Sequence, residues 1–442
     1  MKFEVLSREL IKPYHSTPQS LRDYTLSLID ELLPPMNLPT ILYYYNDNLS
    51  SSSRCQHLKR SLSKVLTRFY PYAGRYIKES FKVDCSDQGA EFVEAKVDVS
   101  LDDFIGQTKN LKMELLNCLL PRPIGAVDGV TDPLLAVQVC AFACGGWAIG
   151  ILTSHRVADM STSSTFVKEW AITAKQLLSE SFDECHDFPV SSWTSASLFP
   201  GKKLSCRPLG MPVAKENFEY HKIVTKVFSF KQNSISRIRE MARLDKSSER
   251  LPSRVQSVIG IIGKAIIDIH VVADPGNSKE FLVIQTVNMR EKTDPPIHKN
   301  QYGNLFLVST APIVASEGGV ELDSIVDLVT RAVRGEVENC KRILSVGGEM
   351  IISDGFDVLT KALAEPEISS NLVFTDWCKF PYYEADFGLA KPVWISGINS
   401  PLGNNVYLFS DQYGEGIEAW VNLSANDMRK FEQDLNIMEF ST

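Results

Sequence analysis

Two hydrophobic periods in the first hundred residues predict both strands and helices. Residues 39–45 form a continuous apolar run rich in aromatic and β-branched side chains, which is typical of a buried strand. Residues 58–69 carry apolar side chains at helical spacing and predict an amphipathic helix. Short strands are expected at 81–84 and 91–97. The N-terminal part therefore alternates strands with helices.

A predicted hairpin leads directly to His155. The apolar runs 137–143 and 147–154 flank Cys144-Gly145-Gly146, a hairpin turn signal. His155 follows the second run, and helical spacing resumes after Asp159. His155 is thus expected at the C-terminal end of a strand, just before a helix, where α/β folds favour active sites.

Periodicity disappears between the two halves of the chain. The stretch is polar, punctuated by prolines and longer than usual connections, so we predict an interdomain linker at 185–217. This divides the chain into domains 1–184 and 218–442, and a segment around 355–385 is a candidate to pack with the N-terminal domain. The second half shows strand patterns at 220–230, 281–287, 405–410 and 416–423, and helix patterns at 234–244, 255–269, 321–345 and after Ser424. The mixture predicts an α/β fold with mixed sheets.

Composition narrows the class of protein. The length of 442 residues favours two or three domains, and 44% hydrophobic with 23% charged residues is typical of a globular protein. A net charge of −8 argues against nucleic acid as a partner. Nine cysteines without a paired spacing fit a reducing compartment, so a cytoplasmic location is expected. No signal peptide and no run of about twenty apolar residues that could span a membrane is predicted.

His155 is the candidate base among seven histidines because of its place at the strand end. A lone histidine is more often structural, and a His-x-x-x-Asp spacing alone is a weak signal. Asp159 could fix the turn so that His155 reaches a substrate hydroxyl. The alternative, in which Asp159 is only the N-cap of the following helix, stays open.

Several enzyme classes lack their required residues. Asp386-Phe387-Gly388 suggests a kinase metal site, but the glycine-rich loop, the strand lysine and the His-Arg-Asp loop are missing. Zinc hydrolases need His-Glu-x-x-His or paired cysteines, and serine hydrolases need Gly-x-Ser-x-Gly; neither motif occurs. No metal site is expected.

Taken together, the motifs resemble the plant BAHD acyltransferases nearly end to end. The defining pair stands as His155-Arg156-Val157-Ala158-Asp159 and Asp386-Phe387-Gly388-Leu389-Ala390. Supporting stretches are Phe69-Tyr70-Pro71-Tyr72-Ala73-Gly74-Arg75, Val287-Asn288-Met289-Arg290 and Tyr302-Gly303-Asn304. Within the family, Ser16-Thr17-Pro18-Gln19-Ser20-Leu21 and Trp377-Cys378-Lys379-Phe380 are most similar to the alkaloid-acetylating branch.

The resemblance implies two chloramphenicol-acetyltransferase-like domains with a channel between them. It implies His155 as the general base and Asp159 as a structural brace that pairs with Arg290. Thr375 and Trp377 match positions that stabilise the oxyanion in relatives, where each preorganised donor is worth roughly 3–4 kcal/mol.

In the same way the resemblance implies architectural roles for other residues and a set of ligands. Asp386, Phe387, Gly388 and Asn304 would be structural. Acyl-coenzyme A, most simply acetyl-coenzyme A, would be a co-substrate with no permanently bound cofactor. The acceptor would be a small-molecule alcohol, an alkaloid, and the protein a monomer.

Three positions depart from the family pattern. Leu389-Ala390 replaces Trp-Gly, Met160 stands where many members have glycine, and Gly263 stands where an aromatic residue is usual. The alternatives to acetyl transfer are malonyl-coenzyme A as donor or an amine as acceptor in the same fold. The Leu389-Ala390 departure adds the alternative of a weakly active or non-catalytic protein.

Overall fold

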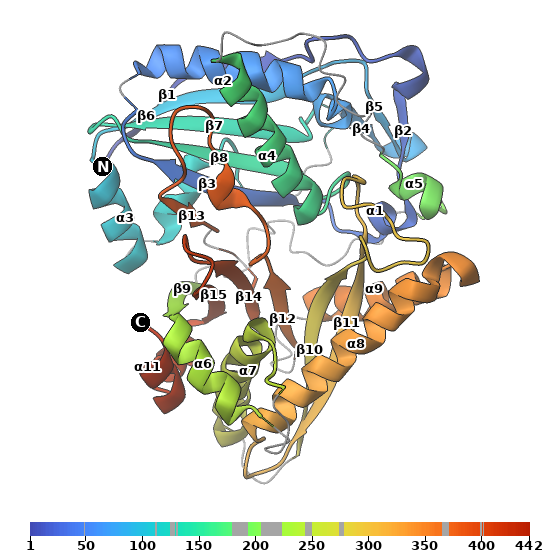
Figure 1. Ribbon diagram of the computed structural model, residues 1–442, viewed down its shortest axis with the longest axis vertical. Coiled ribbons are helices and arrows are strands. Elements are labelled where there is room, and N and C mark those ends of the chain that lie inside the picture. The colour runs from blue at the N-terminus through green and yellow to red at the C-terminus, as the bar shows by residue number, and fades with distance from the viewer. Residues whose placement is uncertain are drawn as a thin grey trace. The chain divides into compact units, whose positions relative to one another are not determined.

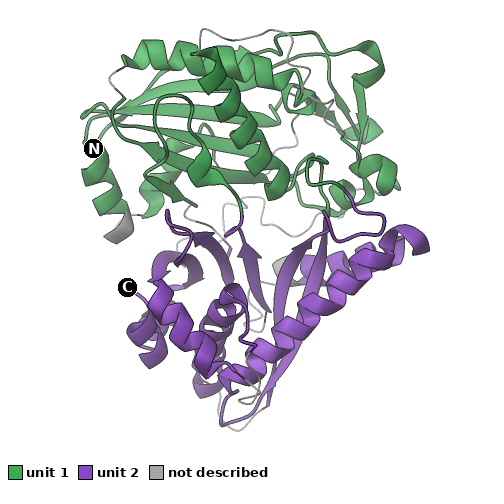
Figure 2. Cartoon of the chain, in the orientation of Figure 1, with its two compact units in different colours: residues 1–208, 298–305, 380–399 green, residues 209–297, 306–379, 400–442 purple. Residues whose placement is uncertain are grey.

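The chain forms two compact units, which Figure 2 shows in different colours. The computed structural model describes residues 1–47, 49–110, 113–123, 129, 131–178, 193–204, 223–243, 250–273, 278–364, 371–397, 400 and 402–442. Unit 1 comprises 1–208, 298–305 and 380–399; unit 2 comprises 209–297, 306–379 and 400–442. Much of the predicted linker 185–217 lies outside the described residues. Segment 380–399 of the C-terminal half belongs to unit 1. From the sequence, a segment around 355–385 was the candidate to pack with the N-terminal domain.

Unit 1 is built on a six-stranded mixed sheet. Its order is β1 (Phe3–Ile11), β6 (Ala90–Val97), β7 (Leu135–Phe142), β8 (Trp147–Ser154), β3 (Asn37–Tyr44) and β13 (Trp394–Ser396). β6 and β7 are parallel, and the other neighbours are antiparallel. Every residue of β3 and of β8 is buried, which explains why both strands are continuous apolar runs in the sequence.

Helices and a small second sheet complete unit 1. Helices α2 (Ser51–Leu66) and α4 (Met160–Leu177) pack against each other over one face of the large sheet, as Figure 1 shows. The remaining elements are α1 (Leu28–Leu32), α3 (Leu101–Asn110), α5 (Ser195–Leu198) and a three-stranded sheet of β2 (Asp23–Thr25), β5 (Lys82–Asp84) and β4 (Arg75–Ile77).

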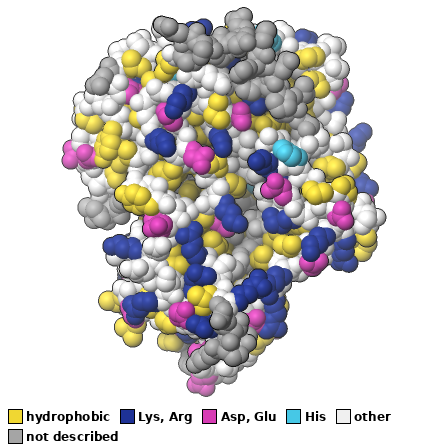
Figure 3. Space-filling view, in the orientation of Figure 1, with side chains coloured by type: hydrophobic (Ala, Val, Ile, Leu, Met, Phe, Trp, Pro, Cys, Tyr) yellow, Lys and Arg dark blue, Asp and Glu magenta, His cyan; other side chains and the backbone are white. Residues whose placement is uncertain are grey.

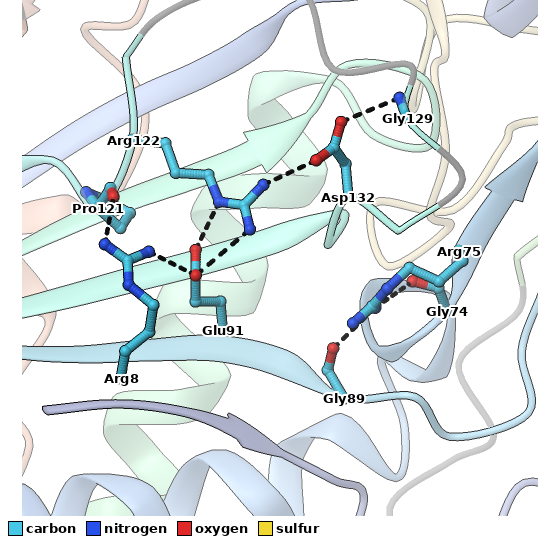
Figure 4. Close-up of polar contacts among 9 residues, drawn as sticks. All are labelled: Arg8, Gly74, Arg75, Gly89, Glu91, Pro121, Arg122, Gly129 and Asp132. Atoms are coloured by element: carbon cyan, nitrogen blue, oxygen red, sulfur yellow. Dashed lines mark hydrogen bonds and ion pairs between the residues drawn. The ribbon is translucent and has the colours of Figure 1, made fainter.

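The edge strand β1 is fastened to the sheet by a buried carboxylate, and the sequence analysis did not predict this strand. Glu91 of β6 is 4% exposed and accepts hydrogen bonds from Arg8 at 2.5 Å and Arg122 at 2.6 Å (Figure 4). Burial would raise the pKa of Glu91, but the bonds from Arg122 and Arg8 keep it below its usual value. Arg122 also bonds to Asp132 at 3.0 Å. Charge pairing thus adds to the backbone ladder with β6 in a strand whose own side chains are largely exposed.

Unit 2 is also a helix-covered six-stranded mixed sheet, so the predicted mixed α/β class is confirmed. Its order is β11 (Phe306–Ala315), β10 (Lys279–Asn288), β12 (Asn371–Asp376), β14 (Asn405–Ser410), β15 (Ile417–Ser424) and β9 (Ile223–Phe230). Its helices are α6 (Gln232–Met241), α7 (Arg254–Ala273), α8 (Leu322–Val346), α9 (Glu349–Ala364), α10 (Ala425–Phe431) and α11 (Leu435–Phe440).

Helix α7 corrects one expectation from the sequence. Its length and composition would allow it to cross a membrane, whereas the sequence analysis found no such stretch. Most of the helix is buried, however, in the core of unit 2, where it packs with α8 and with Phe281 and Val283 of β10.

On the face shown in Figure 3, charged side chains of both signs are interspersed with small hydrophobic groups.

Two glycines of α7 provide a matched test of its packing. Gly263 is buried, yet a Cβ built there meets no atom within 4 Å, whereas a Cβ at Gly260 lies 2.3 Å from Cγ2 of Val326. We expect Gly263→Ala to raise the free energy of unfolding by about 1 kcal/mol, because alanine favours the helix. Gly260→Ala should lower it, because α8 must move. Thermal or urea denaturation of the two variants measures both effects; a stabilised Gly260→Ala would contradict this packing.

Candidate active site

His155 lies one residue beyond β8, and hydrogen bonds to two other segments fix the chain at this point. The His155 N–H donates to the carbonyl of Met36, just before β3, at 2.8 Å. The preceding Ser154 N–H donates to the carbonyl of Leu134, just before β7, at 2.8 Å. The sheet therefore determines where the turn after β8 begins.

The imidazole of His155 is oriented by a carbonyl within its own turn. Its Nδ1 lies 3.0 Å from the carbonyl oxygen of Ala158. A carbonyl can only accept, so Nδ1 carries the proton and Nε2 of the neutral ring keeps its lone pair. Burial lowers the pKa of His155 below its ordinary value, while Asp159 and the bond to Ala158 oppose that shift. The ring is therefore a neutral base at physiological pH.

Asp159 is the N-cap of α4, a contact that is compatible with both roles considered from the sequence. One carboxylate oxygen accepts from the Thr162 N–H at 2.8 Å. The other accepts from the Leu305 N–H at 3.1 Å. Asp159 is 6% exposed. It thereby joins the start of α4 to the segment that contains Tyr302-Gly303-Asn304.

This second segment is bonded to the histidine turn at further points. Asn304 donates from Nδ2 to the carbonyl of His155 at 2.7 Å. Thr162 and Gly303 bond reciprocally, with the hydroxyl donating to the carbonyl at 3.0 Å and the Gly303 N–H donating to the hydroxyl at 3.2 Å. Gly303 has φ +115°, and a Cβ there would lie 2.3 Å from Oγ of Ser195. Thr162 was not predictable from the sequence, because a threonine in the first helical turn carries no signal of a partner 141 residues away.

The Asp386-Phe387-Gly388 motif packs against the other half of α4. Asp386 forms an ion pair with Lys175 at 2.6 Å and accepts from the Gly388 N–H at 2.9 Å. Phe387 is fully buried, with its ring edge-to-face with Trp170 at 5.0 Å. These contacts lie along α4 and do not include His155 or Asp159 in the described residues.

The departures from the family pattern in unit 1 have ordinary packing. Leu389 and Ala390 are both half-buried. Met160 is the first residue of α4 and is 6% exposed, and its sulfur accepts a hydrogen bond from the Tyr382 hydroxyl at 2.8 Å. Met160 thus connects α4 to the segment that leads into Asp386.

Three predicted site residues belong to unit 2 and lie near the C-terminal ends of two of its parallel strands. Thr375 is on β12, and Trp377 follows that strand with its ring 5.1 Å from the rings of both Tyr407 and Phe409. Arg290 follows β10, which is parallel to β12, and donates to the side chain of Asn288 at 3.0 and 3.2 Å. Because parallel strands end at the same edge, these residues lie near one end of the sheet.

The predicted roles that join the two units stay predictions. Asp159 belongs to unit 1, whereas Arg290, Thr375 and Trp377 belong to unit 2.

Other catalytic chemistry has little support among the described side chains. No group of three or more His, Cys, Asp or Glu residues in the described part of the chain is placed to hold a metal ion. Burial raises the pKa of the Cys378 thiol, and Asp376 raises it further, so a thiolate nucleophile is disfavoured there. The strand-end imidazole is the group in unit 1 best suited to remove a proton.

Comparison with known proteins identifies relatives over the full chain. The model of the Transferase family matches residues 1–438. A pelargonidin 3-O-(6-caffeoylglucoside) 5-O-(6-O-malonylglucoside) 4'''-malonyltransferase of Salvia splendens is 36% identical and covers 100% of both chains. Stemmadenine O-acetyltransferase of Catharanthus roseus is 32% identical, with 98% of this chain and 97% of that protein covered.

Vinorine synthase is similar in both sequence and structure. The Rauvolfia serpentina enzyme is 33% identical, with 98% of this chain and 97% of that protein covered. The crystal structure of vinorine synthase aligns with a TM-score of 0.79 at 30% identity, covering 100% of this chain and 98% of that one.

These matches define the class of protein: an acyl-coenzyme A-dependent O-acyltransferase. The chain belongs to the Transferase family, the BAHD acyltransferases. The resemblance inferred from the motifs is thereby confirmed, as are the two-domain mixed α/β architecture and the use of acyl-coenzyme A as a co-substrate.

Gly388 tests the contact between the second motif and α4. It has φ +80°, and a Cβ there would lie 2.7 Å from Cδ1 of Leu178 and 3.0 Å from Cα of Lys175. Gly414 has a similar φ of +73° but open space around its Cβ position. We expect Gly414→Ala to cost about 1–2 kcal/mol through backbone strain alone, and Gly388→Ala to cost clearly more. Equal losses in denaturation experiments would mean that the contact with α4 is unimportant.

The lowered pKa of His155 predicts the pH dependence of the reaction. If the neutral ring is the base, kcat/KM falls about tenfold per pH unit on the acid side, with an apparent pKa below that of free histidine, and it becomes constant once the pH is well above that pKa. Initial rates from pH 5 to 8.5 measure this profile. An acid limb with an apparent pKa above 7 would be incompatible with the desolvated ring.

Proposed function

We propose that this enzyme transfers the acetyl group of acetyl-coenzyme A to a hydroxyl of a plant alkaloid, with His155 as the general base. The observation that carries the catalytic proposal is the hydrogen bond from Nδ1 to Ala158, which leaves Nε2 as the proton acceptor. The similarity to vinorine synthase and stemmadenine O-acetyltransferase supports the acyl group and the acceptor class.

The reaction follows from that tautomer. Nε2 of His155 removes the acceptor hydroxyl proton at a distance of about 2.6–3.2 Å while the oxygen attacks the thioester carbonyl. The tetrahedral oxyanion collapses to the ester and expels the coenzyme A thiolate, which takes the proton back from the imidazolium. We propose that Thr375 and Trp377 stabilise the oxyanion, a role that supplies roughly 3–4 kcal/mol per donor in comparable sites.

The remaining site residues are proposed to position this chemistry. Asp159 caps α4 and would pair with Arg290, so it braces the histidine turn instead of contacting substrate. Asp386, Phe387 and Gly388 would be structural, which their contacts with α4 support.

Malonyl transfer is the second candidate. The Salvia splendens relative, 36% identical, is named as a malonyltransferase. An amine acceptor or a weakly active protein would be less consistent with relatives named as O-acetyltransferases. We also propose a cytoplasmic monomer; the cysteines that the structure describes are all free thiols, as expected in a reducing compartment.

A donor screen separates these candidates. The enzyme is incubated with acetyl- or malonyl-coenzyme A and a pool of plant alkaloids, and products are detected by mass spectrometry. We expect an acetyl increment on an alkaloid alcohol. A malonyl increment would replace the donor assignment, and no product with any alkaloid would contradict the acceptor class.

The same assay tests the base with a matched pair of variants. His155→Ala should lower kcat by about 100-fold or more, since a positioned base contributes 10²–10⁴. His15→Ala removes an exposed histidine that packs edge-to-face with Tyr14 and should leave kcat unchanged. Full activity of His155→Ala would exclude the general-base role.

A further inference from the structure

A buried carboxylate outside both motifs is connected to the histidine turn through one amide. Asp30 lies in the short helix α1 and is 0% exposed. Its Oδ2 accepts from the Ser27 N–H at 2.7 Å, completing a capping box at the start of the helix. Its Oδ1 accepts from Nδ2 of Asn304 at 2.7 Å. The capping box therefore uses only one of the two oxygens.

Asn304 stands between this carboxylate and the backbone of the histidine. Its Nδ2 donates to Asp30 and also to the carbonyl oxygen of His155, in both cases at 2.7 Å. The Asn304 side chain is fully buried. An amide nitrogen with two protons fits two acceptors, and the carboxylate determines which way round the amide sits. Reversal of the amide would place its oxygen against the carbonyl of His155.

We propose that Asp30 is a positioning residue for catalysis: through Asn304 it holds the backbone carbonyl of His155, and with it the imidazole, in the geometry that proton transfer requires. The inference rests on the proposed role of His155 as the base. On this account Asp30 acts through Asn304 and is not a group that binds the substrates.

The cost of this carboxylate supports a role beyond helix capping. Burial raises the pKa of Asp30 to about 7, although the bonds from Ser27 and Asn304 oppose the shift. The nearby charge of Asp159 raises it further, and Asp30 in turn raises the pKa of the Tyr24 hydroxyl. A neutral glutamine at this N3 position could complete a capping box without a buried charge. A strong acceptor for Asn304 explains the choice of a carboxylate.

The next residue of the same helix supplies a matched control. Glu31 is 5% exposed and accepts from the backbone N–H groups of Lys202, Lys203 and Leu204 at 2.9–3.1 Å. Both acids are therefore buried on α1 and hold a distant segment, but only Asp30 leads to His155. Loss of either carboxylate should destabilise the fold. Only the loss of Asp30, and not that of Glu31, should impair catalysis.

The experiment compares Asp30→Ala, Asp30→Asn, Glu31→Ala and His155→Ala in the full-length enzyme. We expect Asp30→Ala to lower kcat about 10–100-fold with KM changed less than about threefold, because small misplacement of a catalytic group can cost that much. Asp30→Asn retains an acceptor oxygen for Asn304 and should recover much of the loss. Glu31→Ala should lower the denaturation midpoint yet keep kcat within about twofold of wild type. A kcat of Asp30→Ala equal to that of Glu31→Ala would overturn the proposal.

A double variant and a chemical probe separate positioning from general damage. If Asp30 acts through Asn304, then Asp30→Ala in an Asn304→Ala background should cause little additional loss of kcat; additive losses would contradict the connection. Diethyl pyrocarbonate modifies the His155 ring, and peptide mass spectrometry measures the rate of this modification at several pH values. We expect the rate to change in Asp30→Ala and to stay the same in Glu31→Ala. An inactive His155→Ala beside a fully active Asp30→Ala would refute this inference alone, whereas an active His155→Ala would refute the proposed function.

Discussion

The hydrogen bond from Nδ1 of His155 to the carbonyl of Ala158 is the interaction on which the catalytic account depends. It fixes the tautomer, and the tautomer decides which nitrogen can accept a proton. The bond exists only because the chain turns back sharply after β8. The turn is fixed at its start by the hydrogen bond from the His155 N–H to the Met36 carbonyl. At its end it is fixed by Asp159, which accepts from the Thr162 N–H. Backbone geometry therefore prepares the base.

Helix α4 connects the two sequence motifs of unit 1 physically. Its N-terminus is capped by Asp159 beside the histidine turn, and its later turns contact Asp386, Phe387 and Gly388 through Lys175, Trp170 and Leu178. The surface ion pair of Lys175 with Asp386 is worth little by itself. Burial of Phe387 and the glycine-only approach of Gly388 to the helix contribute more to the contact. A motif far along the chain can thus affect the base without being near it.

The sequence predicted the local parts of this arrangement well. Continuous apolar runs give buried strands, so β3 and β8 and the histidine at the end of β8 were predictable from residues 39–45 and 147–154. Helix starts such as that at Asp159 have a capping signal. The bonds of Asn304 to His155 and Asp30 were not predictable, since they join residues 149 and 274 positions apart. β1 was not predictable because its exposed face mixes charges with apolar residues, and its pairing is with β6, about 85 residues away along the chain.

The state of the His155 ring tests the central claim most directly. In enzyme labelled with ¹⁵N-histidine, the His155 resonances can be identified by their loss in His155→Ala. At pH 7.5 the account predicts a neutral ring whose proton is on Nδ1, with an unprotonated Nε2 and a titration midpoint below that of free histidine. A proton on Nε2, or an imidazolium ring at that pH, would contradict it.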